Sequence, residues 1–183
     1  MFFINSKGFF MQQHKEIDWN TSFKKASKEN DTATMIYCLN HGTNPLVALY
    51  YTLVNDNEGI VSELIKAKRI EINQPYFANK CTALHVAGSH GSQNTIRELL
   101  KNGAKTDILN GSHFTPRQSC EFAYIDKVGV VETETAENVC RQRYTTCLAL
   151  FDRAEDSQQD PLCIQKAKKP AQKLDNNVHA IGQ

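Results

Sequence analysis

The sequence predicts an all-α solenoid, a stack of about four helix pairs, on the basis of two observations. Segments that begin like a helix recur along the 183 residues, and each is followed by a second segment with apolar residues at i, i+3 and i+4. Each segment would form a helix of only about eight to ten residues, below the ~12–15 at which an isolated helix becomes even marginal in water. Because such short helices need neighbours, a recurring pair of them indicates a stack.

The clearest copy of the pair lies at 82–104. Its first helix begins at Thr82, a residue type suited to capping a helix N-terminus, and is broken by Gly91. Its second helix ends at Gly103, in a position that favours glycine. The apolar positions are Leu84 and Ala87 in the first helix and Ile96, Leu99 and Leu100 in the second. We expect both Leu99 and Leu100 to be core residues.

Three further copies follow the same order. Their first helices begin at TSFKKA (21–26), NPLVAL (44–49) and TPRQSC (115–120). Their second helices carry the triplets Met35/Cys38/Leu39, Val61/Leu64/Ile65 and Tyr144/Cys147/Leu148. We therefore expect one stack over 17–154, with repeats near 20–43, 44–81, 82–114 and 115–154 and an N-terminal extension at 1–16.

Residues 82–104 resemble the ankyrin repeat, a 33-residue unit that reads T-P-L-H-x-A-A, then a glycine, then L-L-x-x-G-A, then a β-hairpin. TALHVAGSHG, IRELL and KNGA follow that order, with Ala83 in place of the proline and Gly88 in place of the second alanine. FTP at 114–116 opens the next unit. The residues that carry the motif are Thr82, Leu84, His85, Ala87, Gly91, Leu99, Leu100, Gly103, Thr115 and Pro116.

The resemblance implies ankyrin-type helix pairs joined by short β-hairpins. It also implies that His85 hydrogen-bonds to threonine and backbone groups and so braces one repeat against the next, since a buried polar group needs partners.

The spacing of the second helices departs from 33 residues at both ends of the chain. Between the first two triplets it is 26, because Gly42 runs almost directly into Asn44, and we expect no hairpin there. Between the last two it is 48, which places about fifteen extra residues around 124–136. The fourth unit is therefore either a lengthened capping repeat or a helix pair with a loop of its own.

Composition excludes several classes of protein. Lys plus Arg is 21 against 20 for Asp plus Glu, so we expect no nucleic-acid partner and no attraction to acidic lipid. The longest apolar run, 45–54, is too short to span a bilayer, and the N-terminus lacks the basic start of a secretory signal. The six cysteines show no CxxC spacing, which indicates reduced thiols in a cytoplasmic protein.

No catalytic or metal motif is recognisable, and we expect no enzyme activity, cofactor, metal or small-molecule substrate. The spacing of Cys81, His85 and His90 matches no zinc signature, and Cys38, Cys120, Cys140 and Cys147 fall at core positions. The alternative is an enzyme whose chemistry lies in 121–137 or in the tail. Its first acids to test are Glu132, Glu134 and Glu137, which equally suit the start of a helix.

The resemblance implies that another protein binds on a concave face made by the connection tips and the first helices. Tyr76, Phe77 and Phe114 are large aromatic residues in those tips, where they either contact a partner or pack locally. The full set of expected contact residues is Tyr76, Phe77, Asn79, Lys80, Ser89, His90, Ser112, His113 and Phe114.

The C-terminal segment and the composition suggest a cellular setting for the protein. Residues 155–183 contain SQQD, KAKKPAQK and NN without apolar periodicity, and we expect a disordered tail. The basic run at 166–169 suits either a nuclear targeting patch or a solvated segment. Fifteen asparagines and many lysines indicate an AT-rich genome, and with the resemblance they favour a bacterial effector that is translocated into a host cell and binds a host protein.

Overall fold

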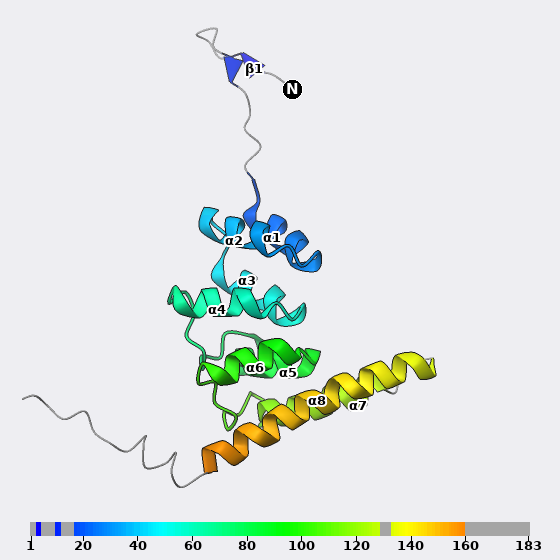
Figure 1. Ribbon diagram of the computed structural model, residues 1–183. Coiled ribbons are helices and arrows are strands. Elements are labelled where there is room, and N and C mark those ends of the chain that lie inside the picture. The colour runs from blue at the N-terminus through cyan, green and yellow to red at the C-terminus, as the bar shows by residue number, and fades with distance from the viewer. Residues whose placement is uncertain (1–2, 5–9, 12–16, 129–132, 160–183) are drawn as a thin grey trace, which may run out of the picture.

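The computed structural model describes residues 3–4, 10–11, 17–128 and 133–159, and eight α-helices lie within them (Figure 1). Two-residue strands β1 (Phe3–Ile4) and β2 (Phe10–Met11) pair antiparallel. The helices are α1 (Trp19–Lys28), α2 (Thr32–His41), α3 (Pro45–Val54), α4 (Glu58–Lys66), α5 (Ala83–His90), α6 (Gln93–Lys101), α7 (Pro116–Val128) and α8 (Glu134–Gln159).

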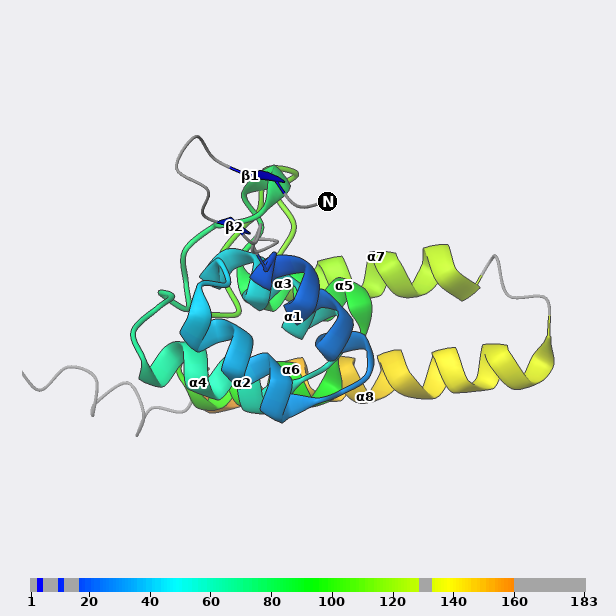
Figure 2. The same cartoon turned by 90° about the horizontal axis from the view of Figure 1, so that it is seen from above.

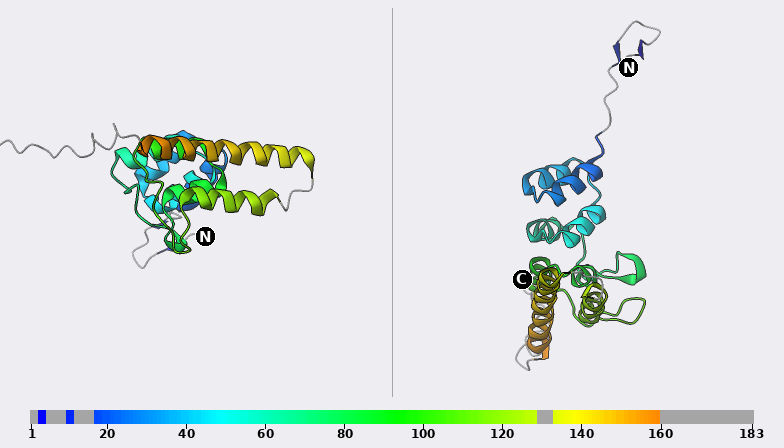
Figure 3. Two further views of the ribbon diagram at one scale, coloured as in Figure 1. Left: turned by 90° about the horizontal axis from the view of Figure 1, so that it is seen from below. Right: turned by 90° about the vertical axis from the view of Figure 1, so that its right-hand side faces the viewer.

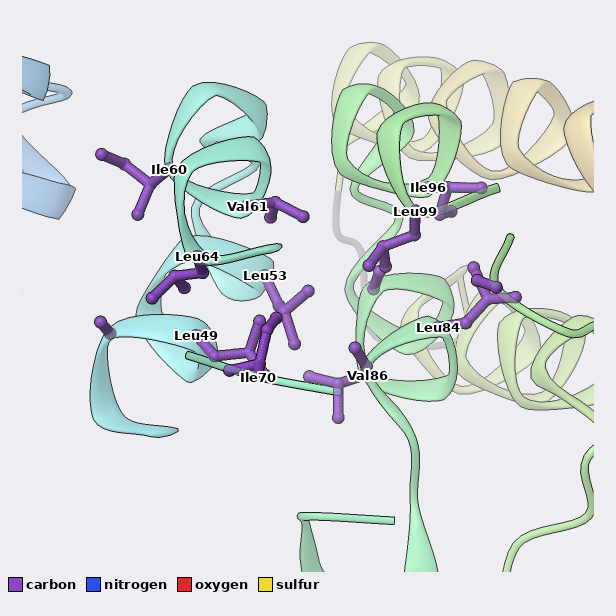
Figure 4. Close-up of a cluster of buried hydrophobic side chains, with 14 of the residues drawn as sticks. Leu49, Leu53, Ile60, Val61, Leu64, Ile70, Leu84, Val86, Ile96 and Leu99 are labelled. Atoms are coloured by element: carbon purple, nitrogen blue, oxygen red, sulfur yellow. The ribbon is translucent and has the colours of Figure 1, made fainter. Parts of the chain in front are cut away.

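The helices form two layers, as the right-hand view of Figure 3 shows. In one layer α1, α3, α5 and α7 pack in sequence, and in the other α2, α4, α6 and α8 do the same. One apolar core runs between the layers, with Leu49, Leu64 and Leu99 among its fully buried side chains (Figure 4). Leu100, in contrast, is only half-buried, so the expectation that it is a core residue equal to Leu99 is wrong.

Short polar side chains set the starts of the first helices. Asp18 caps α1 and accepts the backbone N–H groups of Asn20 and Thr21, at 3.0 and 3.2 Å. Asn44 caps α3 in the same way, and Pro45 follows at the first helical position, which needs no N–H donor. Helix α1 therefore begins two residues before the TSFKKA segment.

Each turn within the first three helix pairs contains one residue with a left-handed backbone conformation. These residues are Asn30, Asp56 and Gly91, with φ of 55°, 59° and 63°. Successive turn residues lie 26 and then 35 residues apart, which are also the spacings of the first three second-helix triplets. Val47 lies 35 residues before Thr82, so Val47 rather than Asn44 is the residue equivalent to Thr82. A first helix does begin at NPLVAL, as expected, but it begins three residues earlier relative to its turn than α5 does, because the Asn44 cap adds almost a turn to the start of α3.

Hydrogen bonds between successive turns hold the pairs in register. Ser27 Oγ donates to Asn57 Oδ1 at 2.9 Å, which joins the first turn to the second. Asp56 Oδ1 accepts the Thr95 N–H at 2.8 Å, which joins the second turn to the start of α6. A turn residue of one pair therefore satisfies backbone donors at a helix start of the next pair.

The connections between pairs are mostly turns. As expected, no hairpin separates α2 from α3, since α2 ends at His41 and Pro45 already opens α3. Beyond α4, the expected β-hairpins appear within the described residues as turns with a single isolated bridge, Phe77 to Cys81. The tips of the two long connections meet: the Gly111 N–H donates to Asn79 O at 2.6 Å, and Asn79 Nδ2 donates to Ser112 Oγ at 2.9 Å.

Both helices of the fourth pair are longer than those of the preceding pair. Helix α7 continues to Val128 and α8 begins at Glu134, so most of the fifteen extra residues extend the two helices; 129–132 lie outside the described residues. Helix α8 also runs to Gln159, so a tail that begins at 155 is placed too early. Figure 2 shows both helices continuing past the rest of the stack. We call this projecting part, residues 124–128 and 133–142, the α7–α8 arm.

Gly88 allows α5 and α7 to approach closely, and Gly88→Ala should lower the free energy of unfolding by about 1–3 kcal/mol. A Cβ atom at this position would lie 2.9 Å from Pro116 O and 3.4 Å from Cys120 Cβ, and the backbone carbonyl cannot rotate away. Urea unfolding followed by circular dichroism measures the effect. Gly59→Ala is the control, because a Cβ there meets nothing within 4 Å; equal stabilities for the two variants would contradict the prediction.

Candidate functional site

His85 joins the α5–α6 pair to the following connection. Its Nδ1 accepts the Thr82 N–H at 3.2 Å and lies 2.8 Å from Thr82 Oγ1, so the neutral ring carries its proton on Nε2 and donates it to Phe114 O at 3.0 Å. Burial lowers the pKa of His85, against the raising effect of the Phe114 and Ile108 carbonyls. These are the bracing contacts that the resemblance implied.

One groove of about 300 Å³ lies between α5 and α7, on the layer of first helices. We call it the α5–α7 groove. Four of the expected contact residues line it, namely Asn79, Ser89, Ser112 and Phe114. Its remaining lining residues are Cys81, His85, Val86, Asn110, Ser119, Phe122 and Ala123.

A second groove, of about 330 Å³, lies along α3 on the same layer, and we call it the α3 groove. Two further expected residues, Tyr76 and Phe77, line it. The other lining residues are Asn44, Leu46, Val47, Tyr50 and Tyr51. The two grooves thus collect six of the nine expected contact residues.

The other three expected residues line neither groove. Lys80 and His113 are exposed and adopt left-handed backbone with φ of 53° and 61°, so they shape the turns of the two tips. His90 is half-buried at the end of α5, with Nδ1 2.9 Å from Val86 O.

The expected aromatic residues both pack and face solvent. Tyr76 is half-buried, and its hydroxyl accepts the Glu71 N–H at 2.8 Å. Phe114 is 39% exposed and stacks on Phe122, with ring centroids 6.1 Å apart. Local packing therefore accounts for part of these side chains, and partner contact by the exposed part stays a prediction.

Sequence reasoning missed three exposed apolar residues of the grooves. Leu46 and Tyr50 are 39% and 41% exposed on α3, and Phe122 is 64% exposed on α7. The i, i+4 spacing of Leu46 and Tyr50 places them on one side of a helix, but the sequence does not tell whether that side faces the core or solvent.

Two of the described cysteine thiols, Cys38 and Cys120, are held protonated in the core. The pKa of Cys120 is raised by its contact with the Cys147 thiol and by burial, and burial also raises the pKa of Cys38. A thiol held protonated in an apolar core is a poor nucleophile. Across the described part of the chain, no group of three or more His, Cys, Asp or Glu residues is arranged to hold a metal ion.

The acids named for the enzyme alternative have ordinary roles where they are described. Glu134 and Glu137 lie in the first turn of α8, which favours negative charge, and Glu137 accepts Arg141 Nη2 at 2.6 Å. Glu132 lies outside the described residues.

Residues 13–110 match the family model for ankyrin repeats in three copies, which is more than half of the chain. The chain belongs to the ankyrin repeat family. The match spans α1 to α6 and ends before the α7–α8 pair. No curated protein gives a significant match to the chain. None of the helices that the structure describes, including the 26-residue α8, is apolar and long enough to cross a membrane.

Proposed function

We propose that this ankyrin repeat protein is a non-enzymatic binding module that holds another protein on its concave face, across the α3 groove and the α5–α7 groove. Ankyrin repeats are generally protein–protein interaction modules. The observation that carries the proposal is the clustering of six aromatic side chains along the two grooves: Tyr50, Tyr51, Tyr76, Phe77, Phe114 and Phe122.

Aromatic side chains on a rigid groove suit partner binding. They bury a large apolar area at a low cost in conformational entropy, and residues of this type dominate the energy of many interfaces. Asn79, Ser89 and Ser112 add polar groups beside them in the α5–α7 groove. A segment that crosses both grooves would thus find apolar contacts together with hydrogen-bonding groups that fix its direction.

The fourth helix pair completes the proposed module as a capping repeat. Thr115 and Gln118 cap the start of α7 reciprocally, since the Thr115 N–H donates to Gln118 Oε1 at 2.9 Å and the Gln118 N–H donates to Thr115 Oγ1 at 3.2 Å. Four pairs offer a short face, which fits one dedicated partner. A cytoplasmic location, the effector role and a host partner stay predictions from composition.

The test compares capture of proteins from cell extract by the wild type and by a Tyr50→Ala/Phe122→Ala variant, with identification by mass spectrometry. One residue comes from each groove, and both are exposed enough that the variant should fold. Loss of hot-spot contacts of ~2 kcal/mol should weaken the binding of a specific partner about thirtyfold.

The control is Tyr37→Ala, an aromatic residue that is 54% exposed on α2, in the other layer. Circular dichroism confirms that each variant is folded. A partner that the double variant captures as well as the wild type would overturn the proposal.

A further inference from the structure

One side of the α7–α8 arm has no covering element among the described residues. Within the stack, α7 packs on α5 and α8 packs on α6. The preceding pair, α5 and α6, is shorter and turns at Gly91 and Ser92, whereas α7 and α8 extend beyond this turn as far as Val128 and Glu134 (Figures 1 and 2). The arm therefore extends past the helices that cover the rest of its pair.

The side chains that pack on the stack continue along the arm as one stripe. Tyr144 and Cys147 are buried, and Arg143 Nε donates to Gly91 O at 2.7 Å, so this side of α8 faces the turn of the preceding pair. One and two turns earlier, Cys140 and Ala136 follow on the same side of the helix. Cys140 is half-buried, and the neighbouring Val139 is 67% exposed.

These residues enclose a recess of about 480 Å³, larger than either concave groove. We call it the arm recess. Its lining residues are Lys127, Thr135, Ala136, Val139, Cys140, Arg143 and Tyr144. None of them lies in the concave face, so the recess is a second and separate surface.

The charge of the arm recess is positive. Lys127 and Arg143 are its two charged lining residues, and Lys127 Nζ lies 5.6 Å from the centre of the Tyr144 ring. Among the described residues, no carboxylate lines the recess. An occupant that places an acidic side chain beside apolar ones would complement both the charge and the apolar floor.

The backbone N–H and C=O groups of the occupant also need hydrogen-bond partners. The floor consists of two α-helices, whose backbone N–H and C=O groups are already paired within each helix. An extended segment would lose water from its backbone there without gaining partners, whereas a helix brings its hydrogen bonds with it. Within the stack, α7 and α8 already pack against helices, namely α5 and α6, so helix packing is the arrangement that this pair uses elsewhere.

We propose that the arm recess is the docking site for an amphipathic helix of a partner protein, with an acidic residue flanking the helix's apolar stripe. The recess continues an interface that already exists inside the molecule, and Lys127 and Arg143 supply the complementary charge. This proposal does not depend on binding at the concave face.

The test selects helices from a displayed library of amphipathic 16-residue peptides, randomised at the apolar stripe and at its flanking positions, on the wild-type protein. Acidic flanking residues should be enriched. Selected peptides should bind Val139→Asp and Lys127→Glu variants at least tenfold more weakly. Leu109→Asp is the control, because Leu109 is 50% exposed and lies outside the recess and both grooves.

Alkylation with iodoacetamide, followed by mass spectrometry, locates the bound peptide. Cys140 lines the arm recess and Cys81 lines the α5–α7 groove, and both thiols are half-buried. A bound helix should slow alkylation of Cys140 at least fivefold and leave the rate at Cys81 unchanged.

Three outcomes would overturn the proposal. In the first, the library yields no helix, or yields helices without acidic enrichment. In the second, the selected helices bind Val139→Asp as well as the wild type or protect Cys81 instead of Cys140. In the third, light scattering shows a wild-type dimer that Val139→Asp dissociates, which would make a second copy of this chain the occupant.

Discussion

Leu99→Ala should lower the free energy of unfolding by about 2–5 kcal/mol, as for a leucine removed from a tightly packed core. Leu99 is fully buried between the layers, and its neighbours Ile96 and Leu84 are buried as well (Figure 4). Removal of the side chain loses the burial of its methyl groups and leaves a cavity that rigid neighbours fill only partly. Urea unfolding followed by circular dichroism measures the loss.

Leu100→Ala is the matched control for this prediction. Leu100 is the adjacent residue on the same helix, has the same side chain and is half-buried, so its replacement should cost clearly less. Equal losses for the two variants would show that burial at these positions differs from that in the structure.

The same experiment tests whether the stack unfolds as one unit. Trp19 is the single tryptophan and lies in α1, in the first helix pair, whereas Leu99 lies in α6, in the third. Because neighbouring repeats stabilise one another, Leu99→Ala should shift the Trp19 fluorescence transition together with the circular dichroism transition. A fluorescence transition left at its wild-type midpoint would mean that the first pair unfolds independently.

His85→Ala should lower the free energy of unfolding by about 3 kcal/mol, because it leaves a cavity and removes the partners of the Thr82 N–H and of Phe114 O. His85→Gln should cost less, since an amide retains both an acceptor and a donor. Urea unfolding at pH 7.5 compares the two variants, and equal losses would contradict the bracing role of the ring.

The wild type should also lose stability as the pH falls below about 6.5. Burial lowers the pKa of His85 in the folded state from its ordinary value of 6.5, so below pH 6.5 the unfolded chain binds a proton that the folded chain does not. The contribution of His85 is complete above pH 6.5 and decreases as the pH falls toward the folded pKa. The slope for one proton is at most about 1.4 kcal/mol per pH unit.

His85→Gln provides the comparison for this pH dependence. Unfolding free energies at pH 7.5, 6.5 and 5.5 should fall more steeply in the wild type than in the variant, which has no titrating ring at this position. Parallel curves for the two proteins would show that His85 does not titrate differently in the folded and unfolded states.

Local chemistry explains why some features could be predicted from the sequence. The 82–104 segment combines a helix-capping threonine, a glycine with φ of 63° at position 91 and apolar residues at helical spacing, all of which act within one helix pair. The same holds for the second helices, whose triplets keep the register of the left-handed turn residues. The aromatic residues of the connections were recognisable because turns alone favour small polar residues.

Features that depend on two helix pairs at once could not be predicted. Gly88 departs from the repeat signature, and only the 2.9 Å approach of a Cβ to Pro116 O explains it. Tyr50 and Phe122 belong to the grooves because of the layer in which α3 and α7 lie, not because of a local motif. The spacing between triplets revealed the extra residues near 124–136, but it did not show that they lengthen both helices.

The sequence by itself thus determined that short helices recur, where most of them begin, and that they belong to an ankyrin stack, because capping and apolar periodicity act over a few residues. The tertiary structure alone decided how closely α5 and α7 pack, which side chains remain exposed in the two grooves, and that the arm continues past its covering helices. Those properties depend on the distance between helix pairs and on the length of each helix relative to its neighbour. Both quantities are determined jointly by residues that lie far apart in the chain.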